Sequence, residues 1–357
     1  MQRIHFKGLD AIRTIAFIST FLAHSISTQS IELSNNSIFI TVTEIATLYG
    51  FGVPVFFVLS GFLITFLMIK DRENGLFSIR NFYIKRILRI WPAYYIVIIF
   101  GFLIFPFLQN LFLDNSKIEN ATVWMYIGFL SNFDQIYNGL PLGAGLGPTW
   151  SVSVEEQFYL FWPLLFLVVK PKYFIYLILS VLTFSLLFSQ FGNIRSQSHT
   201  AFSMIFLSVG SLFGYLYYYN TFSIRTIHKL GWWVMILAFA VSCAFYWIKI
   251  IPSPLYGLFF SIAWGVIIIF QIHTTKLDLS KIKFLERNGK YTYGLYLYHS
   301  IAIFIIHSLF RKILKMEESL SLILLIIPIS SLILSFIFAR VSYWLIESKF
   351  LNLKRKL

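Results

Sequence analysis

The stretch GLDAIRTIAFISTFLAHS, residues 8–25, has the pattern of an apolar helix that carries two ionisable residues, Arg13 and His24. Eleven residues of α-helix advance about 16 Å and return to within about 20° of the same face, so both lie on one stripe. An ionisable stripe in a membrane helix is expected to face protein or a water-filled cavity, because lipid cannot solvate it. The structural alternative is that Arg13 pairs with Asp10 one turn back and that His24 is hydrogen-bonded within a helix bundle.

The composition places the chain in a membrane. Of the 357 residues, 58% are hydrophobic and 12% are charged, whereas a soluble domain contains about 25% charged residues. Runs of about 20 apolar residues recur, which is the length needed to cross a bilayer. The first run is too long and too polar for a cleaved signal peptide, so we expect it to remain as a span. The one cysteine, Cys243, excludes an intramolecular disulfide.

The apolar runs predict an all-α, polytopic membrane bundle of about ten transmembrane helices, built as a single domain over residues 1–357. No fused extracytoplasmic domain is expected, because little sequence follows the last run. The predicted spans are residues 9–28, 48–69, 90–113, 150–169, 172–190, 199–219, 231–249, 254–273, 291–310 and 319–346.

The positions of lysine and arginine predict the orientation of these spans. Of the 29 basic residues, 21 fall on the side that holds both termini, six on the other side and two inside spans. Basic loops remain in the cytoplasm, so we expect both termini there. This distribution accounts for most of the net charge of +14 without a nucleic-acid partner.

Basic residues also gather at the start of the third span, in SIRNFYIKRILRIWPAYY, residues 78–95. Arg86 and Arg89 lie three residues apart and therefore share a helix face. A guanidinium fork matches the geometry of phosphate, which makes this pair a candidate anion site. The alternative is that the two arginines only anchor the span at the cytoplasmic surface.

Two further spans carry ionisable residues at membrane depth. GPTWSVSVEEQFYLFWP, residues 147–163, places Glu155 and Glu156 in the fourth span. One of them could hold the imidazole of His24 in its tautomer or transfer a proton, and the alternative is a cap or ion pair with a neighbouring helix. YTYGLYLYHS, residues 291–300, places His299 in the ninth span, where a hydrogen-bonded seam between helices is the alternative to catalysis.

Taken together, these stretches resemble the bacterial membrane acyltransferase-3 family over essentially the whole chain. Arg13 and His24 match its Arg-x10-His motif, and RILR matches its Arg-x-x-Arg pair. VPVFFVLSGFLIT, residues 53–65, is similar to its second-span signature, and WSVSVEEQFYLFWP, residues 150–163, to its Trp-Ser-x-Ser-x-Glu-Glu-Gln-Phe-Tyr segment. YGLYLYHS corresponds to its Tyr-x-x-Tyr-Leu-Trp-His run, but has Tyr298 at the Trp position and no proline two residues after the histidine.

The resemblance implies a membrane-bound O-acyltransferase of the bacterial cytoplasmic membrane. It implies an acyl-CoA donor, by default acetyl-CoA, and a hydroxyl acceptor on a carbohydrate or lipid-linked glycan. Arg86, Arg89 and Arg13 would then bind the phosphates of coenzyme A. The pantetheine arm, about 15–20 Å long, would bring the thioester to His24 as general base, with no metal required. Glu155 or Glu156 would support the imidazole, and further substrate contacts are expected from Trp150, Ser151, Ser153, Gln157, Tyr298 and His299.

Other functions stay open at this point. Intramembrane charges also mark transport pathways, so a transporter or flippase of an envelope lipid or glycan precursor is an alternative. A polytopic glycosyltransferase that uses a polyprenyl-phosphate sugar is another. The sequence leaves undecided the acyl group, the acceptor sugar, and whether transfer is direct or proceeds through an acyl-histidine.

Overall fold

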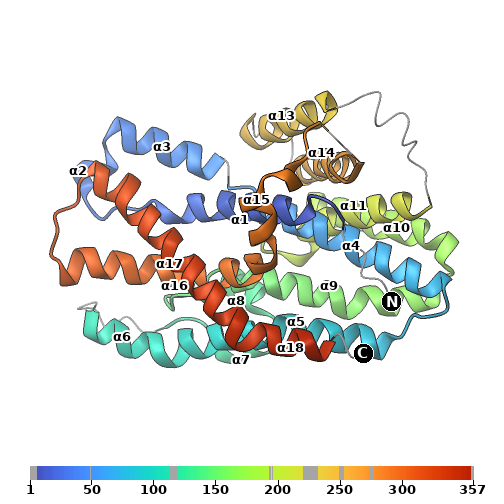
Figure 1. Cartoon of the computed structure of the whole chain (residues 1–357), viewed down its shortest axis with the longest axis horizontal. Coiled ribbons are helices and arrows are strands. Elements are labelled where there is room, and N and C mark those ends of the chain that lie inside the picture. Colours follow the sequence, from blue (N-terminus) through green and yellow to red (C-terminus); the bar gives the residue numbers. More distant parts are fainter. Residues whose placement is uncertain are drawn as a thin grey trace. The chain divides into compact units, whose positions relative to one another are not determined.

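The computed structural model describes residues 6–48, 50–112, 119–192, 194, 196–219, 232–248, 253–273 and 276–354, which form helices and no strands (Figure 1). The prediction of an all-α fold is confirmed for this part of the chain. The ends of two predicted spans, at residues 113, 231 and 249, lie outside it. So do some of the basic residues used to predict orientation, namely Arg3, Lys117, Arg195, Arg225, Lys229, Lys249, Arg355 and Lys356.

The helices follow the chain in an order that Figure 1 labels, with η marking short 3-10 or π-helical pieces. The first half contains α1 (Leu9–Ser25), α2 (Ile31–Ser34), α3 (Ser37–Leu48), α4 (Gly52–Glu73), α5 (Ile79–Ile99), η1 (Phe100–Ile104), α6 (Phe105–Phe112), α7 (Val123–Ile127), α8 (Ser131–Asn138), α9 (Thr149–Val168), η2 (Pro171–Tyr173) and α10 (Phe174–Phe191). The second half contains α11 (Thr200–Tyr218), α13 (Trp233–Ile248), α14 (Ser253–His273), η3 (Leu279–Lys281), α15 (Lys283–Asn288), η4 (Gly289–Tyr291), α16 (Thr292–Ser308), η5 (Leu309–Ile313), η6 (Leu322–Ile326), α17 (Ile327–Ser342), η7 (Tyr343–Glu347) and α18 (Ser348–Lys354).

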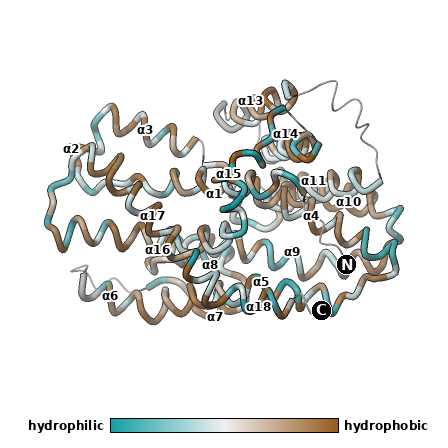
Figure 2. The backbone as a smooth tube through the Cα atoms, in the orientation of Figure 1, coloured by the Kyte–Doolittle hydropathy of each residue, from teal (hydrophilic) through white to brown (hydrophobic). Residues whose placement is uncertain are grey.

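Seven helical segments of the described chain are long and apolar enough to cross a membrane. They are Ser37–Glu73, Ile79–Gln109, Pro171–Phe191, Thr200–Tyr218, Pro254–His273, Lys283–Ile313 and Leu322–Leu353. The other three predicted spans are helical as α1, α9 and α13, but α1 and the apolar part of α13 are shorter and α9 is less apolar. The count of ten is therefore not confirmed, and the cytoplasmic location of the termini stays a prediction. Figure 2 shows the apolar residues that run along most of these helices.

The helices gather into two compact units, each assembled from three separate stretches of chain. Unit 1 comprises Met1–Ala16, Phe51–Phe82 and Glu155–Lys290, and unit 2 comprises Phe17–Gly50, Tyr83–Val154 and Tyr291–Leu357. Helices α1 and α9 each contribute their two ends to different units.

Glycines allow α4 and α11 of unit 1 to approach each other at backbone distance. A Cβ atom at Gly61 of α4, or at Gly210 and Gly214 of α11, would collide with a backbone carbonyl of the opposite helix. Small residues four apart allow membrane helices to approach at backbone distance, where packing and weak hydrogen bonds hold them. The stretch VPVFFVLSGFLIT, residues 53–65, which resembles a family signature, therefore has a packing role at Gly61.

Arg72, at the end of α4, caps α9 within unit 1. Its guanidinium donates to the carbonyl of Phe166 and, at 2.9 Å, to that of Val169. It also lies 5.0 Å from the centre of the Phe166 ring. The last carbonyls of a helix have no partner within the helix, so this cation supplies donors that the backbone cannot.

Replacing Arg72 with methionine is expected to lower the free energy of unfolding by about 2 kcal/mol, because charged hydrogen bonds to helix-end carbonyls are lost. Thermal unfolding in detergent would measure the effect. Lys70→Met removes the same charge from the same turn, where no hydrogen bond of the Lys70 side chain is recorded among the described residues. An equal loss of stability in both variants would contradict the capping role.

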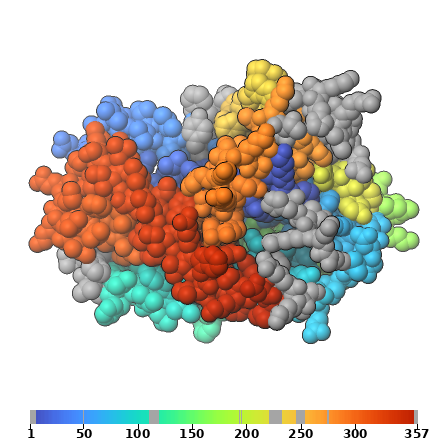
Figure 3. All heavy atoms as spheres, viewed as in Figure 1, coloured from blue at the N-terminus to red at the C-terminus, as the bar shows by residue number. Residues whose placement is uncertain are grey.

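The pairing of α16 with α17 organises unit 2. Small residues of α17, namely Ser331, Ser335 and Ala339, are fully buried. The opposite face exposes Ile329, Ile333 and Ile337 by 49–57%. In Figure 3 the C-terminal part of the chain, which includes α17, is coloured orange to red. Because these residues recur every fourth position, the helix has a narrow protein face and a broad apolar face that suits lipid.

Candidate active site

The imidazoles of His24 and His299, both in unit 2, contact each other. Nδ1 of His24 lies 2.9 Å from Nε2 of His299, and the two ring planes are parallel to within 12°. His299 is fully buried, whereas His24 is exposed. The sequence indicated each histidine separately, but these residues are 275 positions apart and no local pattern predicts their contact.

Helix α1 presents His24 together with two aromatic residues on one face. Phe17, Phe21 and His24 are spaced by four and three residues, which aligns them along an α-helix. The rings of Phe17 and Phe21 meet His299 nearly edge-on, at centroid distances of 6.3 and 6.5 Å. His299 is thus enclosed by apolar groups on the side where it does not touch His24.

A backbone carbonyl determines which nitrogens of this histidine pair carry protons. Nδ1 of His299 lies 2.6 Å from the carbonyl oxygen of Tyr296. A carbonyl can only accept, so in the neutral ring Nδ1 of His299 carries the proton and its Nε2 is an acceptor. Nδ1 of His24 must then donate to that acceptor, which leaves a lone pair on Nε2 of His24. Chemically, Nε2 of His24 can take a proton from a hydroxyl group.

Tyr296 connects this turn of α16 to α9. Its hydroxyl bonds to the hydroxyl of Ser151 at 2.7 Å and to the carbonyl of Pro148 at 3.2 Å. Ser151 is buried, and so is Ser153, which bonds to Ser131 at 2.8 Å. Both serines, predicted as substrate contacts, therefore fasten helices together in this structure, while Trp150 is half-buried on the same helix.

The predicted anion site also lies in unit 2. Arg86 and Arg89 are half-buried on α5, and Tyr293 of α16 donates to the carbonyl of Ile90 at 2.7 Å. Helix α16 therefore touches α5 beside Arg89 and touches His24 six residues later, at His299. Six residues correspond to about 9 Å along the helix axis.

One acidic residue of this region is not among the candidates that the sequence indicates. Glu347, 5% exposed, interacts electrostatically with Arg89 and accepts a hydrogen bond from Ser342 at 3.2 Å. Ser342 in turn bonds to Tyr298 at 2.8 Å, so Tyr298 belongs to this polar cluster. Glu347 ends the π-helical piece η7, and π-bulges often mark functional sites. The sequence signal that could have indicated Glu347 is a carboxylate at the end of the last apolar run.

Other predicted site residues lie in unit 1. Arg13 pairs with Asp10 at 2.5 Å, which is the structural alternative that the sequence left open. Glu155 accepts from the hydroxyl of Ser60 at 2.5 Å. Gln157 accepts from Thr200 at 2.5 Å, and Glu156 is half-buried between them on α9. The proposed support of His24 by Glu155 or Glu156 stays a prediction.

A carboxylate clasp holds the chain directly after α1. Glu318 accepts a hydrogen bond from the hydroxyl of Thr28. It also accepts from the backbone N–H groups of Gln29 and Ser30, both at 3.2 Å. Arg311 pairs with the same carboxylate at 2.6 Å. Thr28 lies four residues after His24 and three residues after the end of α1, so the clasp helps to hold the chain where it leaves the helix that carries the imidazole.

The clasp should make stability depend on pH. Burial raises the pKa of Glu318, but the hydroxyl of Thr28, the Arg311 guanidinium and the two N–H groups outweigh it, so the pKa is below its ordinary value. The folded state therefore binds this proton more weakly than the unfolded state. The stabilisation is complete above the unfolded value of about 4.3 and is lost as the pH falls through the lower folded pKa.

We expect Glu318→Gln to lower the melting temperature at pH 7, and the difference from the unmodified protein to shrink below about pH 4. Glu317→Gln, at an exposed neighbouring position, provides the control. Melting curves from pH 3 to 7 would measure both. A difference that stays constant over this range would contradict the clasp.

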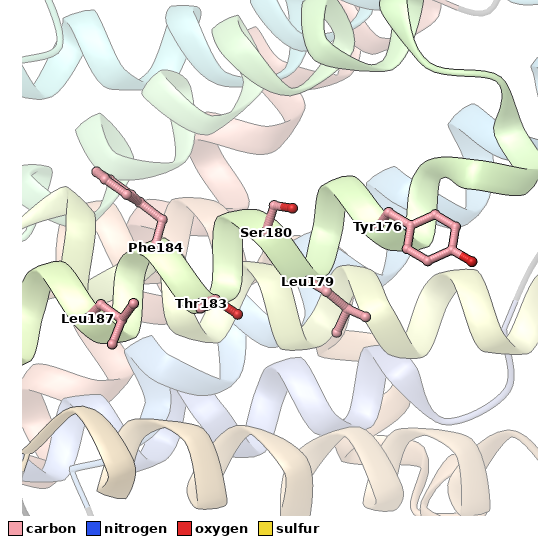
Figure 4. A pocket seen from close by; sticks show the side chains of 6 residues that line it. All are labelled: Tyr176, Leu179, Ser180, Thr183, Phe184 and Leu187. Carbon is pink, nitrogen blue, oxygen red and sulfur yellow. The ribbon is translucent and has the colours of Figure 1, made fainter.

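A surface groove lies along α10. Figure 4 shows that its lining comes from α10 alone, through Tyr176, Leu179, Ser180, Thr183, Phe184 and Leu187. None of the predicted site residues is among them. Most of these side chains are apolar and several are exposed, which suits a surface in contact with lipid better than a catalytic site.

Comparison with known proteins agrees with the resemblance seen in the sequence. A family model described as an acyltransferase domain matches residues 6–340. Peptidoglycan O-acetyltransferase OatA of Listeria monocytogenes is 28% identical over 277 positions, covering 70% of this chain and 44% of that protein. A putative O-acetyltransferase of Staphylococcus aureus (strain COL) is 26% identical over 385 positions, covering 97% of this chain and 57% of that protein.

The chain spans about half the length of these two curated relatives. An uncharacterized protein of Haemophilus influenzae is 37% identical over 144 positions, or 38% of this chain and 56% of that protein. No solved structure matches the chain. Because the family model covers nearly the whole sequence, and its motifs occur in the family's order, this chain belongs to the membrane acyltransferase-3 family.

Proposed function

We propose that this protein transfers an acyl group, by default acetyl, from acyl-CoA at the cytoplasmic face to a hydroxyl of a carbohydrate or lipid-linked glycan at the outer face of the bacterial cytoplasmic membrane. One observation carries the proposal. In a chain of an acyltransferase family, His24 is exposed and keeps a lone pair on Nε2, because its Nδ1 donates to His299.

The proposed chemistry uses His24 as general base. The acceptor oxygen bonds to the thioester carbonyl carbon while its proton passes to Nε2 of His24. The carbon–sulfur bond then breaks, and coenzyme A leaves as a thiol with the proton returned from the imidazolium. The result is one ester and one thiol for each thioester consumed.

The spacing within unit 2 is compatible with this donor. Arg86 and Arg89 would bind phosphate through their guanidinium groups. Along α16, the contact beside Arg89 and the contact to His24 are about 9 Å apart. A pantetheine arm of about 15–20 Å spans this offset together with the length of the side chains. The roles predicted for Arg13, Glu155 and Glu156 remain part of the proposal.

The names of the relatives support a carbohydrate acceptor. One is a peptidoglycan O-acetyltransferase and the other a putative O-acetyltransferase. Both names specify transfer to oxygen, which is the chemistry that an unprotonated imidazole nitrogen assists.

The test uses the purified protein in vesicles with radiolabelled acetyl-CoA and peptidoglycan fragments or lipid-linked glycan. We expect label on the sugar, with one free thiol released per ester formed. Acetyl-pantetheine, which has the thioester but no nucleotide phosphates, should require a much higher concentration. Movement of a lipid-linked glycan across the membrane without loss of acetyl-CoA would instead indicate a transporter.

A further inference from the structure

We propose that His299 is a positioning residue that selects the tautomer of His24, so that Nε2 of His24 is always the nitrogen that accepts the acceptor proton. This inference rests on the proposed acyl transfer. It assigns to His299 a role other than the substrate contact expected from the sequence.

The burial of His299 excludes direct contact with the substrates. Its side chain is 0% exposed, with the rings of Phe17 and Phe21 edge-on to it and the ring of Tyr296 5.7 Å away. His24, by contrast, is exposed. An effect of His299 on the reaction must therefore pass through His24.

A tautomer has to be selected because a neutral imidazole carries its one proton on either nitrogen. With the proton on Nε2, His24 could not accept another there. The carbonyl of Tyr296 can only accept, so it fixes the proton of His299 on Nδ1. Nε2 of His299 is then an acceptor, and through the 2.9 Å contact it fixes the proton of His24 on Nδ1. The hydrogen-bond chain therefore ends on a backbone acceptor of α16: His24 donates to His299, and His299 donates to the carbonyl of Tyr296.

The same contact is retained during the reaction. When Nε2 of His24 takes the proton of the acceptor hydroxyl, both of its nitrogens carry hydrogen, and Nδ1 continues to donate to His299. No proton needs to move to His299. An orienting carboxylate would also stabilise the imidazolium by charge, and a wrong tautomer in such a site costs about 10⁴-fold in rate. We expect a smaller loss here, because the neutral His299 adds no charge.

Three substitutions of His299 distinguish a role in positioning His24 from a role in packing alone. A glutamine amide extends to about the position of Nε2 in histidine and can accept from His24, whereas an asparagine amide ends near the position of Nδ1 and reaches only Tyr296. We expect His299→Ala and His299→Asn to lower kcat about 10²-fold with an unchanged KM for acetyl-CoA. His299→Gln should recover a substantial part of the activity.

The controls decide the outcome in either direction. Melting temperatures of the Asn and Gln variants should agree, so that a difference in kcat reflects the contact with His24. Full activity in His299→Ala, or equal activity in the Asn and Gln variants, would overturn the inference.

A second measurement does not depend on turnover. Nitrogen-15 NMR of histidine-labelled protein should show the Nδ1–H tautomer at His24, identified by the signal lost in His24→Ala, and a mixture of tautomers in His299→Ala. An Nε2–H tautomer, or an unchanged signal in His299→Ala, would overturn the inference. Unmodified protein that transfers no acyl group would overturn the proposed function alone, since the NMR result still decides the role of His299.

Discussion

Replacing His24 with alanine is expected to reduce acyl transfer about 10²–10⁴-fold, because in the proposed mechanism His24 takes the proton of the acceptor hydroxyl. The protein should still fold, because His24 is exposed and is not part of the buried core. Release of thiol from acetyl-CoA together with label on the sugar measures the rate. Binding of acetyl-CoA should be nearly unchanged, since the proposed mechanism places the nucleotide phosphates at Arg86 and Arg89 and not at His24.

Leu22→Ala is the matched control for this change. Leu22 lies on the same helix and exposes 41% of its surface, but it is not among the α1 residues that face His299. It should retain the activity and the melting temperature of the unmodified protein. Full activity of His24→Ala would remove the imidazole from the mechanism and with it the proposed direction of proton transfer.

The largest effect on stability is expected from Gly210→Ala. The added Cβ would collide with the carbonyl of Val58 on α4, and a backbone atom inside a helix cannot move aside without separating α4 from α11. Overpacking of a core costs about 1–3 kcal/mol, and occasionally more. We expect Gly210→Ala to lower the free energy of unfolding by an amount at or above the upper end of this range. Yield of monodisperse protein and thermal unfolding would measure it.

Gly257→Ala provides a comparison in which the added methyl group is expected to leave stability unchanged or to raise it. At this glycine of α14 the added Cβ would meet only the ring atoms of Phe206 and Phe202, at 3.5 Å or more, which is ordinary contact. Alanine is a better helix former than glycine by about 1 kcal/mol, so this variant should be as stable as the unmodified protein or more so. Equal loss of stability in both variants would show that Gly210 is not required for the close packing of α4 against α11.

Several features of the fold and site follow from the sequence because they depend on neighbours along the chain. Apolar runs bounded by polar residues predict the helices, since a backbone in lipid must satisfy its own hydrogen bonds. The three-residue spacing predicts that Arg86 and Arg89 share a face, and that Asp10 can reach Arg13. The motifs in their order indicate the family, which the match over residues 6–340 confirms.

Contacts between distant helices could not be predicted in this way. His24 is 275 positions from His299, and Tyr298 is 44 positions from its partner Ser342. Each pairing depends on the rotation and separation of two helices, which side-chain packing along their whole length determines. A sequence pattern specifies which face of a helix is polar, but it contains no information about which other polar face lies opposite.

The sequence by itself therefore determined that the chain is helical, is built for a membrane, and carries an imidazole and a pair of guanidinium groups on particular helix faces. Only the tertiary structure decided that His299 meets His24, that Tyr296 directs the hydrogen bonds between them, and that Ser151 and Ser153 join helices. The physical reason is range: helical periodicity acts over three or four residues, whereas a tautomer is set by whichever donor or acceptor the folded chain brings within about 3 Å.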